Sequence, residues 1–143
     1  MTARIAALNY LEQFIGLAYR WGGDDAIAGF DCSGLMVEVL QGVGVLPRTG
    51  DWSAEGLRLK FGATAVPIEG CLAFRMSNGK AVHVGMVWSV LQDGTVLLIE
   101  AGGGDSTVVS EADAVAQNAF VKLRPVWAGA VYADPFTSAA GDV

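Results

Sequence analysis

Apolar side chains in the first sixty residues recur every three or four positions, which is the spacing of one face of an α-helix. Within residues 1–15 the recurring positions are Ile5, Leu8, Leu11 and Ile15. A second apolar segment covers residues 32–41, after which two glycines favour the end of a helix. A third covers residues 51–60, with Thr49 or Asp51 as its N-cap. The first part of the chain therefore predicts three helices joined by loops.

From residue 71 onward the pattern changes to short runs rich in aliphatic and β-branched residues. Asn78-Gly79 and Asp93-Gly94 interrupt these runs, and both pairs are typical of tight hairpin turns. The predicted strands cover residues 71–76, 82–88, 95–100, 107–109 and 120–124, with a short helix over residues 111–117. Helices followed by an antiparallel meander predict an α+β fold, with N-terminal helices packed on a C-terminal antiparallel sheet.

Length and composition narrow the class of protein. A chain of 143 residues suits one domain, expected over residues 1–132, with a short tail over residues 133–143. Hydrophobic residues make up 52% and charged residues 17%, which excludes general disorder. The net charge of −6 argues against nucleic acid or anionic lipid as the main partner. No apolar run approaches the roughly 20 residues of a membrane-spanning helix, and no secretory signal is recognisable at the start.

Cys32 is the first candidate for chemistry. Asp31 is a good N-cap, so Cys32 is predicted to lie in the first turn of an apolar helix. Unpaired backbone N–H groups and the helix dipole favour the nucleophilic thiolate there. The alternative is a buried structural cysteine, which is the commoner role of a single cysteine in an apolar helix. A zinc site made with Cys71 and His83 is a further alternative, but the spacing matches no common site, and neither a metal nor another cofactor is expected.

His83 is the single histidine of the chain and lies in a predicted strand. Strand alternation places its side chain on one face and Val82 and Val84 on the other. Nucleophilic catalysis by cysteine needs a base that accepts the thiol proton and later protonates the leaving amine. Cys32 and His83 are therefore a candidate catalytic pair.

Four segments together resemble the NlpC/P60 family of cysteine peptidases. They are Tyr19-Arg20-Trp21-Gly22-Gly23, Gly29-Phe30-Asp31-Cys32-Ser33-Gly34-Leu35, His83-Val84-Gly85-Met86 and Ile99-Glu100-Ala101. The resemblance covers roughly residues 5–127 and implies a papain-like core. It implies hydrolysis of amide bonds in peptidoglycan stem peptides, usually between γ-D-glutamate and a diamino acid, as a thiol protease that degrades the cell wall.

Roles for individual residues follow from the same resemblance. By position, Cys32 is the nucleophile, His83 the base and Glu100 the polar residue that orients the imidazole. Four further residues are implied around the substrate: Tyr19 shapes the oxyanion site, Asp31 and Ser33 hold the amino end of the stem peptide, and Trp21 lies near the cleft.

The chain departs from the family pattern at two of these places. Glu100 occupies a position that is more often histidine, although a carboxylate can also hold the imidazole tautomer. Cys71 stands where the family commonly has aspartate, and it is interpreted as a packed, inert strand residue.

Two other functions stay open at this point. One is a catalytically idle structural or assembly component of a tail-like particle, and the other is an amidase or acyltransferase on the same fold. The resemblance is greatest to short stand-alone peptidases of phage or phage-derived tails. We therefore expect synthesis in the cytoplasm and incorporation into a phage-like tail with tail or baseplate-like proteins, with the apolar Pro135-Phe136 as one contact.

Overall fold

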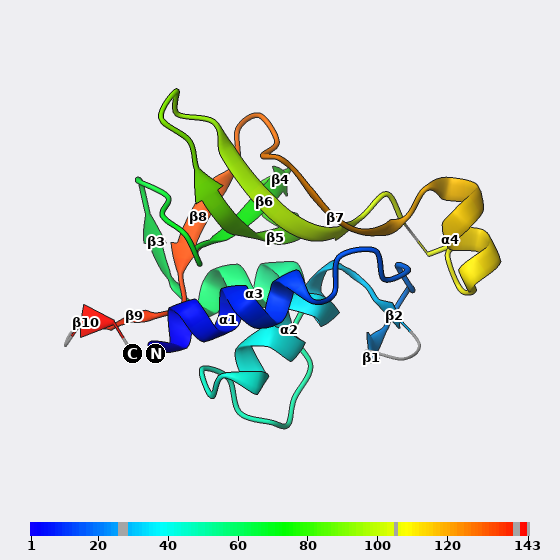
Figure 1. The fold of residues 1–143 in the computed structure, drawn as a ribbon, viewed down its shortest axis with the longest axis horizontal. Helices are drawn as coiled ribbons and strands as arrows, with labels where there is room; N and C mark the ends of the chain where they lie inside the picture. Colours follow the sequence, from blue (N-terminus) through cyan, green and yellow to red (C-terminus); the bar gives the residue numbers. More distant parts are fainter. Residues whose placement is uncertain (26–28, 105, 139–140, 143) are drawn as a thin grey trace.

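The computed structural model describes residues 1–25, 29–104, 106–138 and 141–142, and it has the expected α+β architecture. Helices α1 (Ala3–Glu12), α2 (Cys32–Gly42) and α3 (Ala54–Lys60) lie against one side of a six-stranded sheet, whereas α4 (Glu111–Gln117) lies beyond its end (Figure 1). The sheet comprises β3 (Gly62–Thr64), β4 (Leu72–Ser77), β5 (Lys80–Val90), β6 (Val96–Gly102), β7 (Phe120–Pro125) and β8 (Val131–Asp134). Two short hairpins lie outside it: β1 (Asp24–Asp25) with β2 (Gly29–Phe30), and β9 (Thr137–Ser138) with β10 (Gly141–Asp142).

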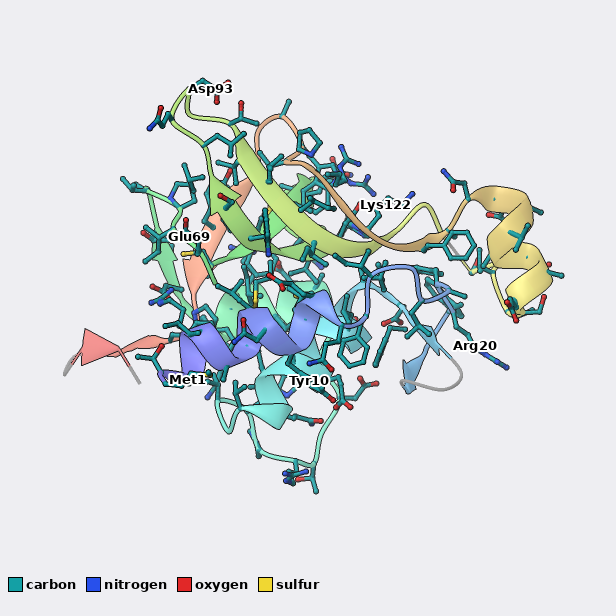
Figure 2. All side chains as sticks on the ribbon, viewed as in Figure 1. Met1, Tyr10, Arg20, Glu69, Asp93 and Lys122 are labelled. Atoms are coloured by element: carbon teal, nitrogen blue, oxygen red, sulfur yellow. The ribbon has the colours of Figure 1, made fainter. Side chains whose placement is uncertain are left out.

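The strand order is β3-β8-β4-β5-β6-β7, and every neighbouring pair is antiparallel. Both predicted hairpins are confirmed. Asn78 and Gly79 have φ values of 52° and 77°, as the turn between β4 and β5 requires. The turn between β5 and β6 contains Asp93, which Figure 2 shows at a hairpin tip that points away from the helices.

Strand alternation divides the buried side chains between two clusters. The larger cluster fills the space between α1–α3 and the sheet and includes Met86 and Ile99. The smaller cluster contains Val87, Leu98 and Trp127. Val87 and Leu98 are the chain neighbours of Met86 and Ile99, so their side chains point to the opposite face of the sheet. The sheet is therefore packed on both faces, and the segment around Trp127 covers the face opposite the helices.

The packed domain extends past residue 132, where sequence reasoning placed its end. Strand β8 runs to Asp134 and pairs with both β3 and β4, and the side chain of Phe136 is fully buried. Arg4 ties this segment to α1 through an ion pair of 2.9 Å with Asp134, and its guanidinium lies over the Phe136 ring. Pro135 and Phe136 are buried, so the expected partner contact at this pair is wrong.

Three other expectations are corrected by the structure. Helix α1 buries Arg4, Ala7 and Leu11, while Ile5 is 49% exposed and Ile15 lies beyond the helix end. Helix α3 begins after Ser53, whose hydroxyl accepts the Gly56 N–H, so neither Thr49 nor Asp51 is its cap.

The third correction concerns residues 107–109, which form no strand. Val108 is buried there, and its carbonyl accepts the Trp21 N–H at 2.8 Å. The segment therefore supports the loop before β1 instead of joining the sheet.

Candidate active site

Cys32 is the first residue of α2 and is half-buried. Asp31 caps this helix, because its Oδ1 accepts the Gly34 N–H at 2.7 Å. Its Oδ2 accepts the Gly22 N–H at 3.1 Å, which ties the glycine loop to the helix start. The carboxylate thus holds the backbone on both sides of the cysteine.

Gly34 explains why this helix start is so compact. A Cβ at this position would lie 2.0 Å from the Gly23 carbonyl oxygen, a distance that no side chain tolerates. The helix and the glycine loop therefore meet backbone to backbone. This contact fixes the direction in which the Cys32 side chain leaves the helix.

His83 lies on β5 between two partners. Its imidazole interacts favourably with the Cys32 thiol, and its Nε2 is hydrogen-bonded to Glu100 Oε2. Burial opposes the charged imidazolium, but the interactions with Cys32 and Glu100 outweigh burial and raise the pKa of His83 from 6.5 to about 9. The site therefore favours a protonated imidazole next to the sulfur at neutral pH.

Glu100 comes from β6 and is 2% exposed. A buried carboxylate is costly without partners, and here it has two: His83, and the Arg124 guanidinium 3.8 Å from Oε1. Trp127 completes this group, since its ring lies edge-on to the His83 ring at 5.0 Å and beneath the Arg124 guanidinium at 5.6 Å. Sequence reasoning did not anticipate this contact between Trp127 and the imidazole.

A cavity of about 230 Å³ opens beside the cysteine. Its lining residues are Gly22, Gly23, Asp31, Ser33, Gly34, Asp51, Trp52 and Ser53. Asp31 and Ser33 thus share one cavity, and Asp51 adds a second carboxylate that sequence reasoning missed. Burial raises the pKa of the Asp31 carboxyl, while the N–H bonds from Gly34 and Gly22 act in the opposite direction. Among the described residues the Trp52 indole N–H is buried without a hydrogen-bond partner.

The remaining predicted site residues differ in their exposure. Tyr19 is 3% exposed and pairs with Phe30 through an isolated β-bridge. Phe30 directly precedes Asp31, the N-cap of α2. Trp21 is 56% exposed and does not line the cavity beside the cysteine. Roles for both residues in substrate binding stay predictions.

Cys71 is more deeply buried than Cys32. It is 1% exposed, and burial raises the pKa of its thiol. The described part of the chain shows no group of three or more histidine, cysteine and acidic residues that could hold a metal ion. None of the helices in that part combines the length and apolar character needed to cross a membrane.

A cysteine at a helix N-terminus facing a strand histidine that a carboxylate holds is the arrangement of papain-like cysteine enzymes. The profile of the NlpC/P60 family matches residues 16–124. The chain therefore belongs to the NlpC/P60 family, and the resemblance of its motifs to that family is confirmed.

Individual relatives agree with this assignment. The chain is 39% identical over 90 residues to the murein DD-endopeptidase MepH of Escherichia coli, a match that covers 56% of the chain and 31% of the relative. The solved NlpC/P60 domain of the peptidoglycan hydrolase SagA superimposes with a TM-score of 0.68 at 24% identity, covering 92% of this chain and 97% of that one.

A third relative shows that the fold alone does not define an enzyme. RipD of Mycobacterium tuberculosis superimposes with a TM-score of 0.64 at 18% identity, covering 93% of this chain and 97% of that one. It is described as a non-catalytic NlpC/P60 protein adapted to peptidoglycan binding. Activity must therefore be argued from the side chains.

Proposed function

We propose that the protein is a cysteine peptidase that hydrolyses amide bonds in peptidoglycan stem peptides. The observation that carries the proposal is the series Cys32–His83–Glu100, in which the imidazole interacts with a half-buried cysteine and is hydrogen-bonded to a buried carboxylate. The names of the relatives MepH and SagA supply the substrate class.

In the acylation step the Cys32 thiolate attacks the amide carbonyl carbon. The negative charge that develops on the carbonyl oxygen is stabilised by the Cys32 backbone N–H, which lies at the start of α2 where helical N–H groups have no intrahelical partner. The protonated His83 then gives its proton to the leaving nitrogen, and the C–N bond breaks.

In the deacylation step neutral His83 removes a proton from water, and the hydroxide attacks the thioester. The C–S bond breaks, the product leaves as a carboxylic acid that then releases its proton to water, and Cys32 is regenerated as the thiolate beside imidazolium. Glu100 keeps its charge throughout and orients the ring, as the third residue of such triads does.

The cavity beside the cysteine supports recognition of a cationic group. Asp31 and Asp51 place two carboxylates on its walls, and Ser33 adds a hydroxyl. Because both Asp31 oxygens already accept backbone N–H bonds, Asp51 has the greater capacity for a substrate ammonium. An amino end of a stem peptide has this chemistry.

Two bonds are candidates for cleavage. Resemblance to the family favours the bond between γ-D-glutamate and the diamino acid, whereas the name of MepH favours a bond between two D-configured centres. Mass analysis of digested sacculi separates them, because the first cleavage shortens stems and the second converts cross-linked dimers into monomers.

The deciding experiment compares the wild-type protein with Cys32→Ala and the matched control Cys71→Ala. We expect wild type and Cys71→Ala to release muropeptides, and Cys32→Ala to lose activity on the order of 10³-fold or more with unchanged circular dichroism. An inactive Cys71→Ala beside an active Cys32→Ala overturns the choice of nucleophile.

The same digestion tests the other functions. No release by a wild-type protein whose Cys32 also resists iodoacetamide indicates an idle structural or peptidoglycan-binding component. Release from a glycan-linked lactyl amide or a lipid ester, with stems left intact, indicates an amidase or acyltransferase.

Action as part of a phage-like tail after synthesis in the cytoplasm is a separate proposal. It is supported by the resemblance of the motif set to stand-alone tail peptidases. Co-purification with tail or baseplate-like proteins tests it, and efficient export of the chain on its own contradicts it.

A further inference from the structure

Glu100 and His83 do not face each other directly across the sheet. The register between β5 and β6 reaches the pair Met86 and Ile99; His83 lies three residues before Met86 in β5, whereas Glu100 directly follows Ile99 in β6. The contact between His83 and Glu100 is therefore diagonal. Diagonal neighbours in an antiparallel pair are roughly 7–8 Å apart, so the Glu100 side chain must run along the sheet surface to reach the ring.

Two glycines lie beneath that side chain. A Cβ at Gly85 would approach the Glu100 Cβ to 3.1 Å. A Cβ at Gly102 would lie 2.2 Å from Oε1, 2.6 Å from Cδ and 2.9 Å from Oε2 of Glu100. Since favourable non-bonded contacts begin at roughly 3.5 Å, the carboxylate occupies the volume that a side chain at position 102 would need.

The backbone gives no other reason for glycine at position 102. Gly102 ends β6 and is absent from the glycines with positive φ, unlike Gly103 with φ of 80°. Any residue could adopt its conformation. The atoms that a Cβ would meet all belong to Glu100, so the requirement is for space alone.

We propose that Gly102 is a positioning residue for Glu100: its missing side chain leaves the space in which the carboxylate lies to hold the His83 ring. This inference rests on the proposed function, since it concerns the same site. It assigns a role to a residue that lies outside the series Cys32–His83–Glu100 and touches no substrate.

The first test is Gly102→Ala. Because the added methyl meets the far end of a flexible side chain, the carboxylate moves and the fold is retained. A displacement on the order of 1 Å lowers the rate of a positioned reaction about 10²-fold, so kcat falls by this factor with KM little changed. The matched control is Gly62→Ala in β3, where a Cβ meets nothing within 4 Å, and it keeps wild-type activity.

The second test is a double-mutant cycle with Glu100→Ala. Gly102→Ala lowers activity in the wild-type background and changes nothing further once Glu100 is alanine. Additive losses, or a Gly102→Ala protein with wild-type rate and pH profile, overturn the inference. If Gly102→Ala alone does not fold, the double variant decides: a folded double variant supports the inference, and an unfolded one overturns it.

The third readout separates this inference from the proposed function. The rate of Cys32 alkylation by iodoacetamide is followed against pH, with the modified residue identified by mass spectrometry. Gly102→Ala is expected to shift this profile in the same direction as Glu100→Ala and by no more than that variant does, whether or not the protein hydrolyses stem peptides. No shift in Gly102→Ala, or a shift in the opposite direction, overturns the positioning role, whereas shifts in the same direction without hydrolysis overturn only the substrate assignment.

Discussion

Replacing Glu100 with glutamine removes the charge beside His83 and keeps the size and one acceptor oxygen. The imidazole then loses an opposite charge in direct contact, an effect typically worth about 1–3 pKa units. Burial of the ring, which opposes the charged form, remains. We therefore expect the pKa of His83 to fall from about 9 by roughly one unit or more in Glu100→Gln.

The same shift has a consequence for stability. Below pH 6.5 the imidazole is protonated in both the folded and the unfolded chain, so the stabilisation by its partners is complete. Between pH 6.5 and about 9 the unfolded chain loses this imidazole proton while the folded chain keeps it, so the contribution of His83 to the free energy of unfolding falls as pH rises. A shift from 6.5 to about 9 corresponds to about 3 kcal/mol at roughly 1.4 kcal/mol per unit.

Both quantities are measurable because the chain contains 1 histidine. Its ring resonances give the pKa directly in an NMR titration, and denaturant unfolding at pH 6 and pH 9 gives the loss of stability. Glu111→Gln, at an exposed position in the first turn of α4, is the control and leaves both values unchanged. A wild-type His83 that titrates at or below 6.5, or the same pKa in Glu100→Gln as in wild type, refutes the reasoning.

Two further changes test the packing around the site. Phe136→Ala should destabilise the protein by about 3–5 kcal/mol in denaturant unfolding, because the Phe136 ring is fully buried. The control Val115→Ala, at a 64% exposed position, should cost less than about 0.5 kcal/mol. Equal losses of stability in the two variants would contradict a core role for Phe136. Asp31→Ala should lower the free energy of unfolding by about 1–2 kcal/mol because it removes the N-cap of α2, and Asp31→Asn should lower it less, both measured by thermal unfolding. Unchanged stability in Asp31→Ala would mean that the cap does not stabilise α2.

Local signals were sufficient for much of the fold. The hairpins at Asn78-Gly79 and Asp93-Gly94 follow from turn residues that readily adopt the positive φ values that tight hairpin turns need. The end of the domain could not be predicted in the same way, because β8 is four residues long and is stabilised by pairing with β3 and β4, which are distant in sequence. Pro135 and Phe136 resembled a tail because nothing nearby in the chain indicates what buries them.

The residues of the candidate site also divide into those that local sequence signals predict and those whose positions depend on distant parts of the chain. Cys32 was predicted from its helix start and His83 from its predicted strand, whereas the role of Glu100 was expected from the resemblance to the family. Arg124 and Trp127 were missed because their contacts depend on how β7 and the following segment return across the sheet. A glycine two residues after Glu100 and another two after His83 were visible signals, but their meaning requires the register between β5 and β6.

The position of β8 between β3 and β4 has a consequence for the order of folding during synthesis. The ribosome completes both neighbours long before it reaches Val131, so until then β4 has one unpaired edge and β3 has no strand partner on either edge. Unpaired strand edges are the places where nascent chains associate wrongly, and long-range pairings of this kind also form slowly. Strand β8 therefore completes the sheet. Until β8 has been synthesised and paired, the growing polypeptide is most exposed to aggregation.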